Sequence, residues 1–173
     1  MDKYLYWLAN VSGLGTASRE CLLEAFDTGA AVYAAQEKHL AMVLEKVKLE
    51  KLLEKRKTWD LDREYARLQE RQILFVCTAD AEYPERLRHI PDHPFGIYYK
   101  GRLPQPPKLA VAVVGARECS DYGRFIATEL GKELGAAGVQ VISGMARGID
   151  GISQLAALEA GGESYAVLGN GVD

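Results

Sequence analysis

Apolar residues recur every three or four positions through the first 71 residues, and no proline occurs before Pro84. This spacing is typical of amphipathic helices, and from about residue 36 onward charged residues of both signs fill the positions between the apolar ones. The segment Trp59–Asp62 is expected to end one helix and cap the next, which runs to about Gln72. We therefore expect an all-helical domain over residues 1–72.

Two glycines, Gly13 and Gly15, separate the first predicted helix from a second, which covers about residues 16–26 with Thr16 as its N-cap. Their spacing resembles the turn of a helix-hairpin-helix or SAM-like domain, in which glycine amides can bind a DNA phosphate. Gly13 and Gly15 are therefore candidates for a secondary DNA contact. The alternative is a tight turn between packed helices, because no cation follows the turn until Arg19. Both interpretations remain open on the sequence alone.

From about residue 73 the apolar spacing becomes strand-like, which marks the start of a second domain over residues 73–173. Its first part predicts a strand at 73–77, a short helix after Pro84 and an edge strand at 95–101. Strands and helices then alternate, with strands at 109–114, 139–143 and 164–168 and helices at 120–137 and 148–160. Short connections between such elements specify right-handed crossovers, so we expect an α/β fold with an incomplete Rossmann-like parallel sheet.

The helix at 120–137 is expected to start at the cap Ser120 and to end before Gly138, a left-handed terminator. Its predicted buried stripe consists of Phe125, Ile126, Leu130 and Leu134. The preceding strand is apolar almost throughout, a pattern that predicts helices on both of its faces.

Composition narrows the functional classes. The chain has 173 residues, 48% of them hydrophobic, and a formal net charge of −3, so a polyanion site must be a local pocket rather than a basic surface. The three cysteines are far apart and the three histidines have no cysteine at ligand spacing, which favours neither a disulfide framework nor a metal site, and no cofactor is expected. No export signal and no membrane-length apolar run is visible, so we expect a cytoplasmic protein that does not contact membranes.

Glycines and arginines follow the predicted parallel strands, at the sheet edge where such folds bind ligands. The guanidinium groups of Arg117 and Arg147 follow neighbouring strands, and two such groups favour a phosphate, a nucleotide or a nucleic-acid backbone. Backbone amides of the loops and of the next helix would be neutral donors to the same ligand. The alternative to ligand binding is an ion pair within the protein, between Arg117 and a nearby acid and between Arg147 and Asp150. The candidate binding residues are Gly115, Arg117, Ser143, Gly144, Met145, Arg147, Gly148 and Asn170.

Signatures of common enzymes are missing from these loops. Neither GxGxxG nor GxxxxGK[ST] occurs, and Ser143 lacks both the GxSxG context and an activating histidine. Asp150, beside a helix start, is interpreted as an N-cap rather than a catalytic carboxylate. No catalytic residue is predicted.

Three blocks occur in a fixed order, Val113–Arg117 with Tyr122–Gly123, then Ser143–Asp150, then Ala166–Asp173, and Tyr83–Pro84, Leu87 and Tyr98–Gly101 lie upstream of them. Together they resemble the DNA-processing protein A (DprA, or Smf) family. The resemblance implies a non-enzymatic protein that binds and protects incoming single-stranded DNA and helps load RecA recombinase on it in natural transformation. It also implies a homodimer in the full-length protein. The open alternative is a Rossmann-like enzyme that binds or processes nucleotides, and a third is an interaction scaffold.

Two departures from the family pattern bear on these expectations. Ser153–Gln154 stands where the family often has Ala-His, so no role of that histidine is carried over. The sequence ends at Asp173, where the family continues, which predicts a fragment whose sheet exposes an edge and apolar surface.

Overall fold

The computed structural model describes residues 2–104 and 106–172, which form two compact units that meet in sequence between Gly101 and Arg102. Among the described residues no helix is both long and apolar enough to cross a membrane.

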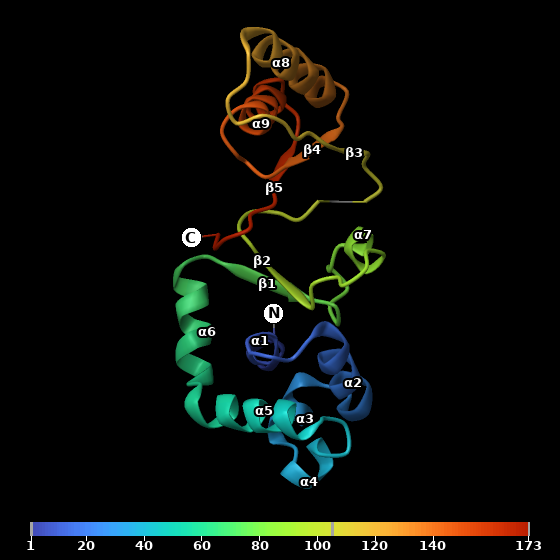
Figure 1. Cartoon of the computed structure of the whole chain (residues 1–173), viewed down its shortest axis with the longest axis vertical. Helices are drawn as coiled ribbons and strands as arrows, with labels where there is room; N and C mark the ends of the chain where they lie inside the picture. Colours follow the sequence, from blue (N-terminus) through green and yellow to red (C-terminus); the bar gives the residue numbers. More distant parts are fainter. Residues whose placement is uncertain (1, 105, 173) are drawn as a thin grey trace. The chain divides into compact units, whose positions relative to one another are not determined.

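The first unit contains short helices followed by a two-stranded antiparallel sheet (Figure 1). Asp2, Thr28 and Asp60 cap three of its helices by accepting hydrogen bonds from backbone amides. The predicted helix at 16–26 and the helix break around Asp60 are confirmed. The elements are α1 (Lys3–Ala9), α2 (Thr16–Phe26), α3 (Gly29–Ala34), α4 (Glu37–Leu40), α5 (Lys46–Thr58), α6 (Leu61–Glu70), β1 (Leu74–Cys77), α7 (Glu85–Arg88) and β2 (Gly96–Tyr99).

Tyr6 of α1 explains why this compact unit extends past residue 72, where the sequence pattern changes. Its ring makes edge contacts with Trp59, Phe75 and Tyr98, at centroid distances of 5.9, 5.9 and 6.1 Å. Phe75 and Tyr98 lie on β1 and β2, so the strands share the aromatic core of the helices. The boundary between the two compact units lies after Gly101, about 30 residues later than the domain boundary that we expected after residue 72. The expected domain boundary remains a prediction.

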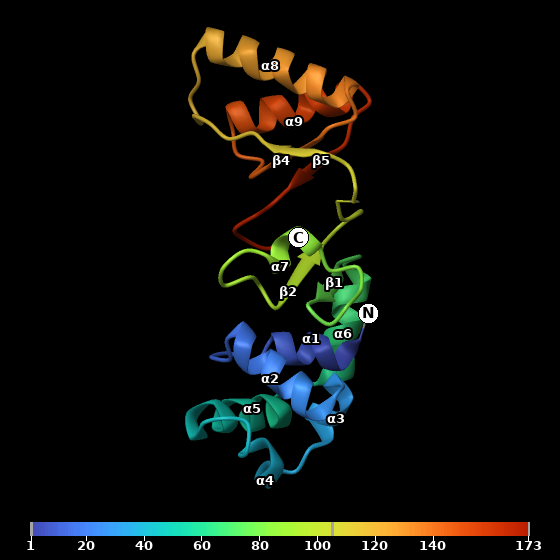
Figure 2. The ribbon, with the colours of Figure 1, turned by 90° about the vertical axis from the view of Figure 1, so that its right-hand side faces the viewer.

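The second unit is a parallel sheet with strand order β3-β4-β5 (Ala110–Ala112, Gln140–Ser143 and Ser164–Ala166) and crossover helices α8 (Asp121–Ala136) and α9 (Ile149–Glu159). Both helices lie on the same side of the sheet, as Figure 2 shows. Val113, Val141 and Ala157 form the buried core, against which Leu134 and Ile149 pack. Ser120 caps α8 by accepting a hydrogen bond from Gly123 N at 3.1 Å, and Gly138 has the expected positive φ of 72°. The predicted α/β class with a small parallel sheet is confirmed.

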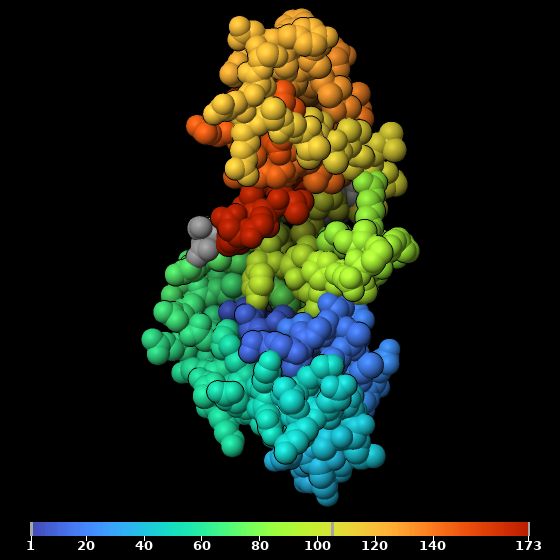
Figure 3. Space-filling model, viewed as in Figure 1, coloured from blue at the N-terminus to red at the C-terminus, as the bar shows by residue number. Residues whose placement is uncertain are grey.

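The predicted buried stripe of α8 is wrong at three of its positions. Phe125 is 60% exposed, and Ile126 and Leu130 are also exposed. The helix instead packs on α9 through Ala127, Gly131 and Gly135, because small residues let the two helix backbones approach closely. Figure 3 shows the orange α8 segment at the surface of this unit.

The apolar strand at 109–114 is likewise not enclosed on both faces. β3 is an edge strand of the described sheet, and Leu109, Val111 and Val114 are exposed. An edge strand has a neighbour on one side only, so its apolar side chains lack the cover that a central strand receives.

Candidate functional site

The candidate residues lie on the loops that follow the three parallel strands. Arg117 follows β3, Arg147 follows β4 and Asn170 follows β5, and all three are exposed. Since parallel strands end at the same edge of a sheet, these loops share the position where open α/β sheets bind ligands.

The loops after β3 and β4 are in direct backbone contact. Ile149 N donates a hydrogen bond to Ala116 O at 3.2 Å. Gly148 has a φ of 87°, and a Cβ added there would lie 2.6 Å from the carbonyl oxygen of Arg117. Gly148 is therefore required by the packing of one loop on the other, and this packing places the backbones that carry Arg117 and Arg147 next to each other.

Asp150 supplies the buried charge of this region. Its side chain is 6% exposed, and its Oδ1 accepts a hydrogen bond from Gly115 N at 3.0 Å. Burial by itself raises the pKa of this carboxyl, but hydrogen bonds from Ser143 and from the amides of Gly115 and Gly144 outweigh burial and hold the pKa below its usual value. Asp150 is therefore an ionised carboxylate enclosed by neutral donors. It is not the N-cap expected from the sequence, because that position belongs to Gly148.

These hydrogen bonds correct the expectation that the loop amides are open to a phosphate. The amides of Gly115 and Gly144 already bind Asp150. The start of α9 is also occupied, since Ile149 N donates to Ala116 O and Gly151 N donates to Ala146 O at 3.0 Å. These amides are therefore paired within the protein, the loop glycines with the Asp150 carboxylate and the helix start with backbone carbonyls, so we expect side chains to hold most of a phosphate.

Ser143 also faces inward. Its hydroxyl is buried and donates to Val113 O at 2.5 Å, which fixes β4 to the end of β3. Met145, by contrast, is 59% exposed with a positive φ of 55°, and it stands at the outer bend of the β4 loop. Ser143 therefore supports the loops from within, while Met145 lies on their outer surface.

Arg117 and Arg147 are the charged residues among the candidates. Within residues 2–104 and 106–172, neither Arg117 nor Arg147 forms an ion pair. The alternative pairing of Arg147 with Asp150 is not seen, since the carboxylate is held by amides. Two exposed guanidinium groups on contacting loops remain the chemistry best suited to phosphate.

Sequence reasoning misassigned one residue of this region and missed another. Asp150, interpreted as an N-cap, accepts a hydrogen bond from Gly115 across 35 positions, a contact that periodicity does not reveal. Arg124 lies exposed in the first turns of α8, which begins at the same sheet edge as the Arg117 loop. Arg124 could have been predicted from the sequence, because a helix that follows a parallel strand starts at the carboxyl edge of that strand, where the ligand site is expected.

Arg19, the arginine that follows the Gly13–Gly15 turn in sequence, has a structural role. Arg19 is partly buried and donates hydrogen bonds to the carbonyl oxygens of Leu8, Ala9 and Val11 at 2.9, 2.9 and 3.0 Å, which satisfies the end of α1. The predicted N-cap is also displaced by one residue, because Gly15 caps α2 and Thr16 instead donates its hydroxyl to His93 O at 2.9 Å.

Lys51 of α5 supplies the cation that the hairpin sequence lacked. A Cβ added at Gly13, whose φ is 77°, would lie 2.5 Å from Lys51 Nζ. The Gly15 cap provides no side-chain acceptor for the first amides of α2. The turn thus combines a glycine, uncapped amides and an exposed ammonium, the elements that a secondary DNA contact at Gly13 and Gly15 needs.

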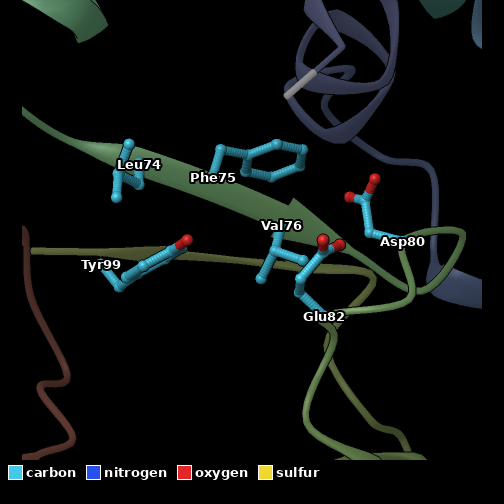
Figure 4. Close-up of a pocket in the computed structure, with 6 residues that line it drawn as sticks. All are labelled: Leu74, Phe75, Val76, Asp80, Glu82 and Tyr99. Atoms are coloured by element: carbon cyan, nitrogen blue, oxygen red, sulfur yellow. The ribbon is translucent and has the colours of Figure 1, made fainter. Parts of the chain in front are cut away.

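A shallow pocket of about 230 Å³ lies on the β1–β2 sheet, away in sequence from the glycine loops (Figure 4). Its lining includes the carboxylates of Asp80 and Glu82 and the side chain of Tyr99. Two acidic groups repel a phosphate, and Asp80 already accepts a hydrogen bond from Cys77 N at 2.8 Å. This pocket is not the polyanion site.

Known proteins are similar to this chain over most of its length. A solved structure of DNA processing protein A from Streptococcus pneumoniae matches with a TM-score of 0.77 and 27% identity, over 99% of this chain and 59% of that one. Protein Smf of Synechocystis is 30% identical over 97% of this chain, which spans 44% of that relative. Protein Smf of Escherichia coli is 42% identical over 57% of this chain, which spans 26% of that relative.

The match to a family model covers the β1–β2 sheet and both glycine loops. The model of the family described as DNA recombination-mediator protein A matches residues 74–173, more than half of the chain. This range contains the contacting loops of Arg117 and Arg147 and the enclosed Asp150. The chain belongs to the DNA recombination-mediator protein A family, as the resemblance of its glycine loops predicted.

Proposed function

We propose that this chain binds single-stranded DNA through its phosphate backbone, at the sheet edge formed by the loops after β3 and β4. Arg117 and Arg147 supply the cations, and Met145 and Asn170 complete the exposed surface of the loops. In this role the chain is a non-enzymatic cytoplasmic protein that protects incoming DNA and helps load RecA recombinase in natural transformation, as a homodimer in its full-length form. Binding to phosphates predicts little dependence on base sequence.

One observation carries the proposal. Two exposed arginines, which have no acidic partner among the residues that the structure describes, stand on loops whose backbones are fixed to each other, at the ligand-binding edge of an α/β sheet. Fixing the loops keeps the backbones that carry the two positive charges next to each other, which suits the closely spaced charges of a nucleic-acid backbone.

The names of the relatives support the choice of DNA and of a recombinase partner. The solved relative and others are called DNA processing proteins, and the family description specifies recombination mediation. The chain spans less than two thirds of these relatives, so the activity of the whole protein enters only as part of this proposal.

The proposal is tested by fluorescence anisotropy with a labelled single-stranded oligonucleotide over a range of salt concentrations. Changing Arg117 and Arg147 together to Glu is expected to weaken binding by at least about 10-fold and to reduce the dependence of log K on log salt by about 1.4, two phosphate contacts at about 0.7 each. A control variant, Lys132→Glu, changes an exposed charge in the second half of α8 and is expected to bind like the original chain. Unchanged affinity and salt dependence in the double variant would show that the DNA binds elsewhere.

Nucleotide chemistry is the competing function. Asp150 is the buried carboxylate that contacts the loops, but it accepts hydrogen bonds from backbone amides, so it is not poised to accept a substrate proton. Calorimetric titration with nucleoside monophosphates distinguishes the two functions: tight binding followed by product formation would establish an enzyme, whereas the DNA proposal expects neither.

A further inference from the structure

Asp150 holds the first residues of both arginine loops at once. Gly115 lies on the β3 loop, and its amide donates a hydrogen bond to Asp150 Oδ1 at 3.0 Å. Ile149 packs so closely against Gly115 that a Cβ there would clash. Gly144 is the first residue of the β4 loop and lies against the same carboxylate, since a Cβ added at Gly144 would lie 3.5 Å from Asp150 Oδ2. Arg117 lies two residues beyond the first contact and Arg147 three beyond the second.

The surroundings of Asp150 suit a structural anchor. The carboxylate is almost fully buried in the first turn of α9, and it accepts from the backbone amide of Gly115 rather than from a lysine or an arginine. A buried carboxylate that binds several amides is costly to displace, because its loss leaves those amides without acceptors. The two loops are therefore coupled through one side chain of α9.

We propose that Asp150 is a positioning residue that fixes the Arg117 loop and the Arg147 loop in one arrangement and thereby sets the spacing of the two guanidinium groups. The inference rests on the proposed function as far as the ligand is DNA. The coupling of the loops itself follows from the Gly115 hydrogen bond and the Gly144 contact alone.

The sign of the effect separates positioning from simple electrostatics. A negative charge close to a phosphate site repels DNA, so if Asp150 acted only through its charge, its replacement by Asn would strengthen binding. A positioning role predicts that replacing Asp150 by Asn weakens DNA binding. The Asn carbonyl can accept only part of the donor set, and its NH₂ group, which donates, would meet amides that also donate.

The experiment compares the full chain with its Asp150→Asn and Asp150→Ala variants, using a labelled single-stranded oligonucleotide and ¹H–¹⁵N correlation spectra. Asp150→Asn is expected to weaken DNA binding by about 3- to 10-fold, and Asp150→Ala by more than that. The Gly115 amide resonance is expected to shift and its hydrogen exchange to accelerate in both variants. A matched control, Asp121→Asn, removes an exposed carboxylate from the first turn of α8 and is expected to leave the Gly115 resonance unmoved and not to weaken DNA binding.

The outcomes are separable. Tighter or unchanged DNA binding by a folded Asp150→Asn variant overturns the positioning role, as does an unmoved Gly115 resonance. Absence of DNA binding by the original chain overturns the proposed function, while the Gly115 amide still reports whether Asp150 couples the loops. Should Asp150→Ala unfold, Asp150→Asn and the Gly115 spectrum decide the matter by themselves.

Discussion

The Cα of Gly131 faces the carbonyl oxygen of Ser153 so closely that a Cβ at this position has no room. The same added atom would lie 2.9 Å from the Cβ of Ala156, so backbone and side chain of α9 both obstruct it. This contact is what lets α8 pack on α9 while its large apolar residues remain at the surface.

Gly131→Ala is therefore expected to destabilise the second unit by about 1–3 kcal/mol, because α8 must move away from α9 to accommodate the methyl group. Gly123 in the same helix is the matched control. A Cβ there meets its nearest neighbour at an ordinary 3.4 Å, and Gly123→Ala is expected to be neutral or to stabilise the helix by up to about 1 kcal/mol. Urea unfolding measures both variants, and equal stabilities would contradict the close packing.

Arg19 is expected to matter for stability and not for DNA. Arg19→Ala removes three hydrogen bonds to carbonyl oxygens at the end of α1 and is expected to cost about 2 kcal/mol or more. Arg63→Ala changes an exposed arginine of α6 and is expected to remain within about 0.5 kcal/mol of the original stability. A loss of DNA affinity in folded Arg19→Ala would show that this guanidinium reaches the ligand after all.

Local signals in the sequence predicted most element positions. Ser120, Gly138 and Asp60 act as the cap, terminator and cap that their residue types favour, so α6 and α8 start where predicted and α8 ends within one residue of the expected position. The loops of Arg117 and Arg147 were found for a similar reason, since a strand pattern followed by glycine marks the edge of a parallel sheet.

Contacts between distant residues account for what the sequence did not predict. The apolar pattern of α8 indicates a buried stripe at Phe125 and Leu130, yet the small residues Gly131 and Gly135 determine the packed face because backbone proximity outweighs side-chain size there. Asp150 was interpreted as a cap because its neighbours in sequence belong to a helix start. Its actual partner, Gly115, lies on another strand end and becomes visible only when β3 and β4 pair.

Cys77 is expected to resist thiol reagents in the folded protein. Burial raises the pKa of its thiol to about 12, so almost no thiolate exists near neutral pH, whereas Cys21 is exposed and Cys119 is half-buried. Mass spectrometry after brief iodoacetamide treatment should find Cys21 modified first, Cys119 more slowly and Cys77 only after denaturation. Modification of Cys77 at the rate of Cys21 would contradict its enclosure.

The stability of the second unit is expected to depend on pH through Asp150. Its pKa is lower in the folded protein than the usual value of about 3.9, so its contribution is complete above that value and is lost as the pH falls through the folded-state pKa. Asp150→Asn should therefore be less stable than the original chain at pH 7, and the difference should shrink toward pH 2. Asp121→Asn provides the control, and a difference independent of pH would contradict an ionised Asp150.

Lys51 offers a test of the glycine hairpin as a secondary DNA contact. Its ammonium lies over Gly13 at the uncapped start of α2, so reversing its charge should remove one phosphate contact. We expect Lys51→Glu to weaken single-stranded DNA binding by about 3-fold and to lower the salt dependence by about 0.7, the contribution of one contact. Lys57→Glu is the matched control, because it places the same charge at an exposed position near the end of the same helix. If both variants weaken binding equally, the effect is one of overall charge and the hairpin glycines form only a turn; a loss confined to Lys51→Glu assigns the contact to the hairpin.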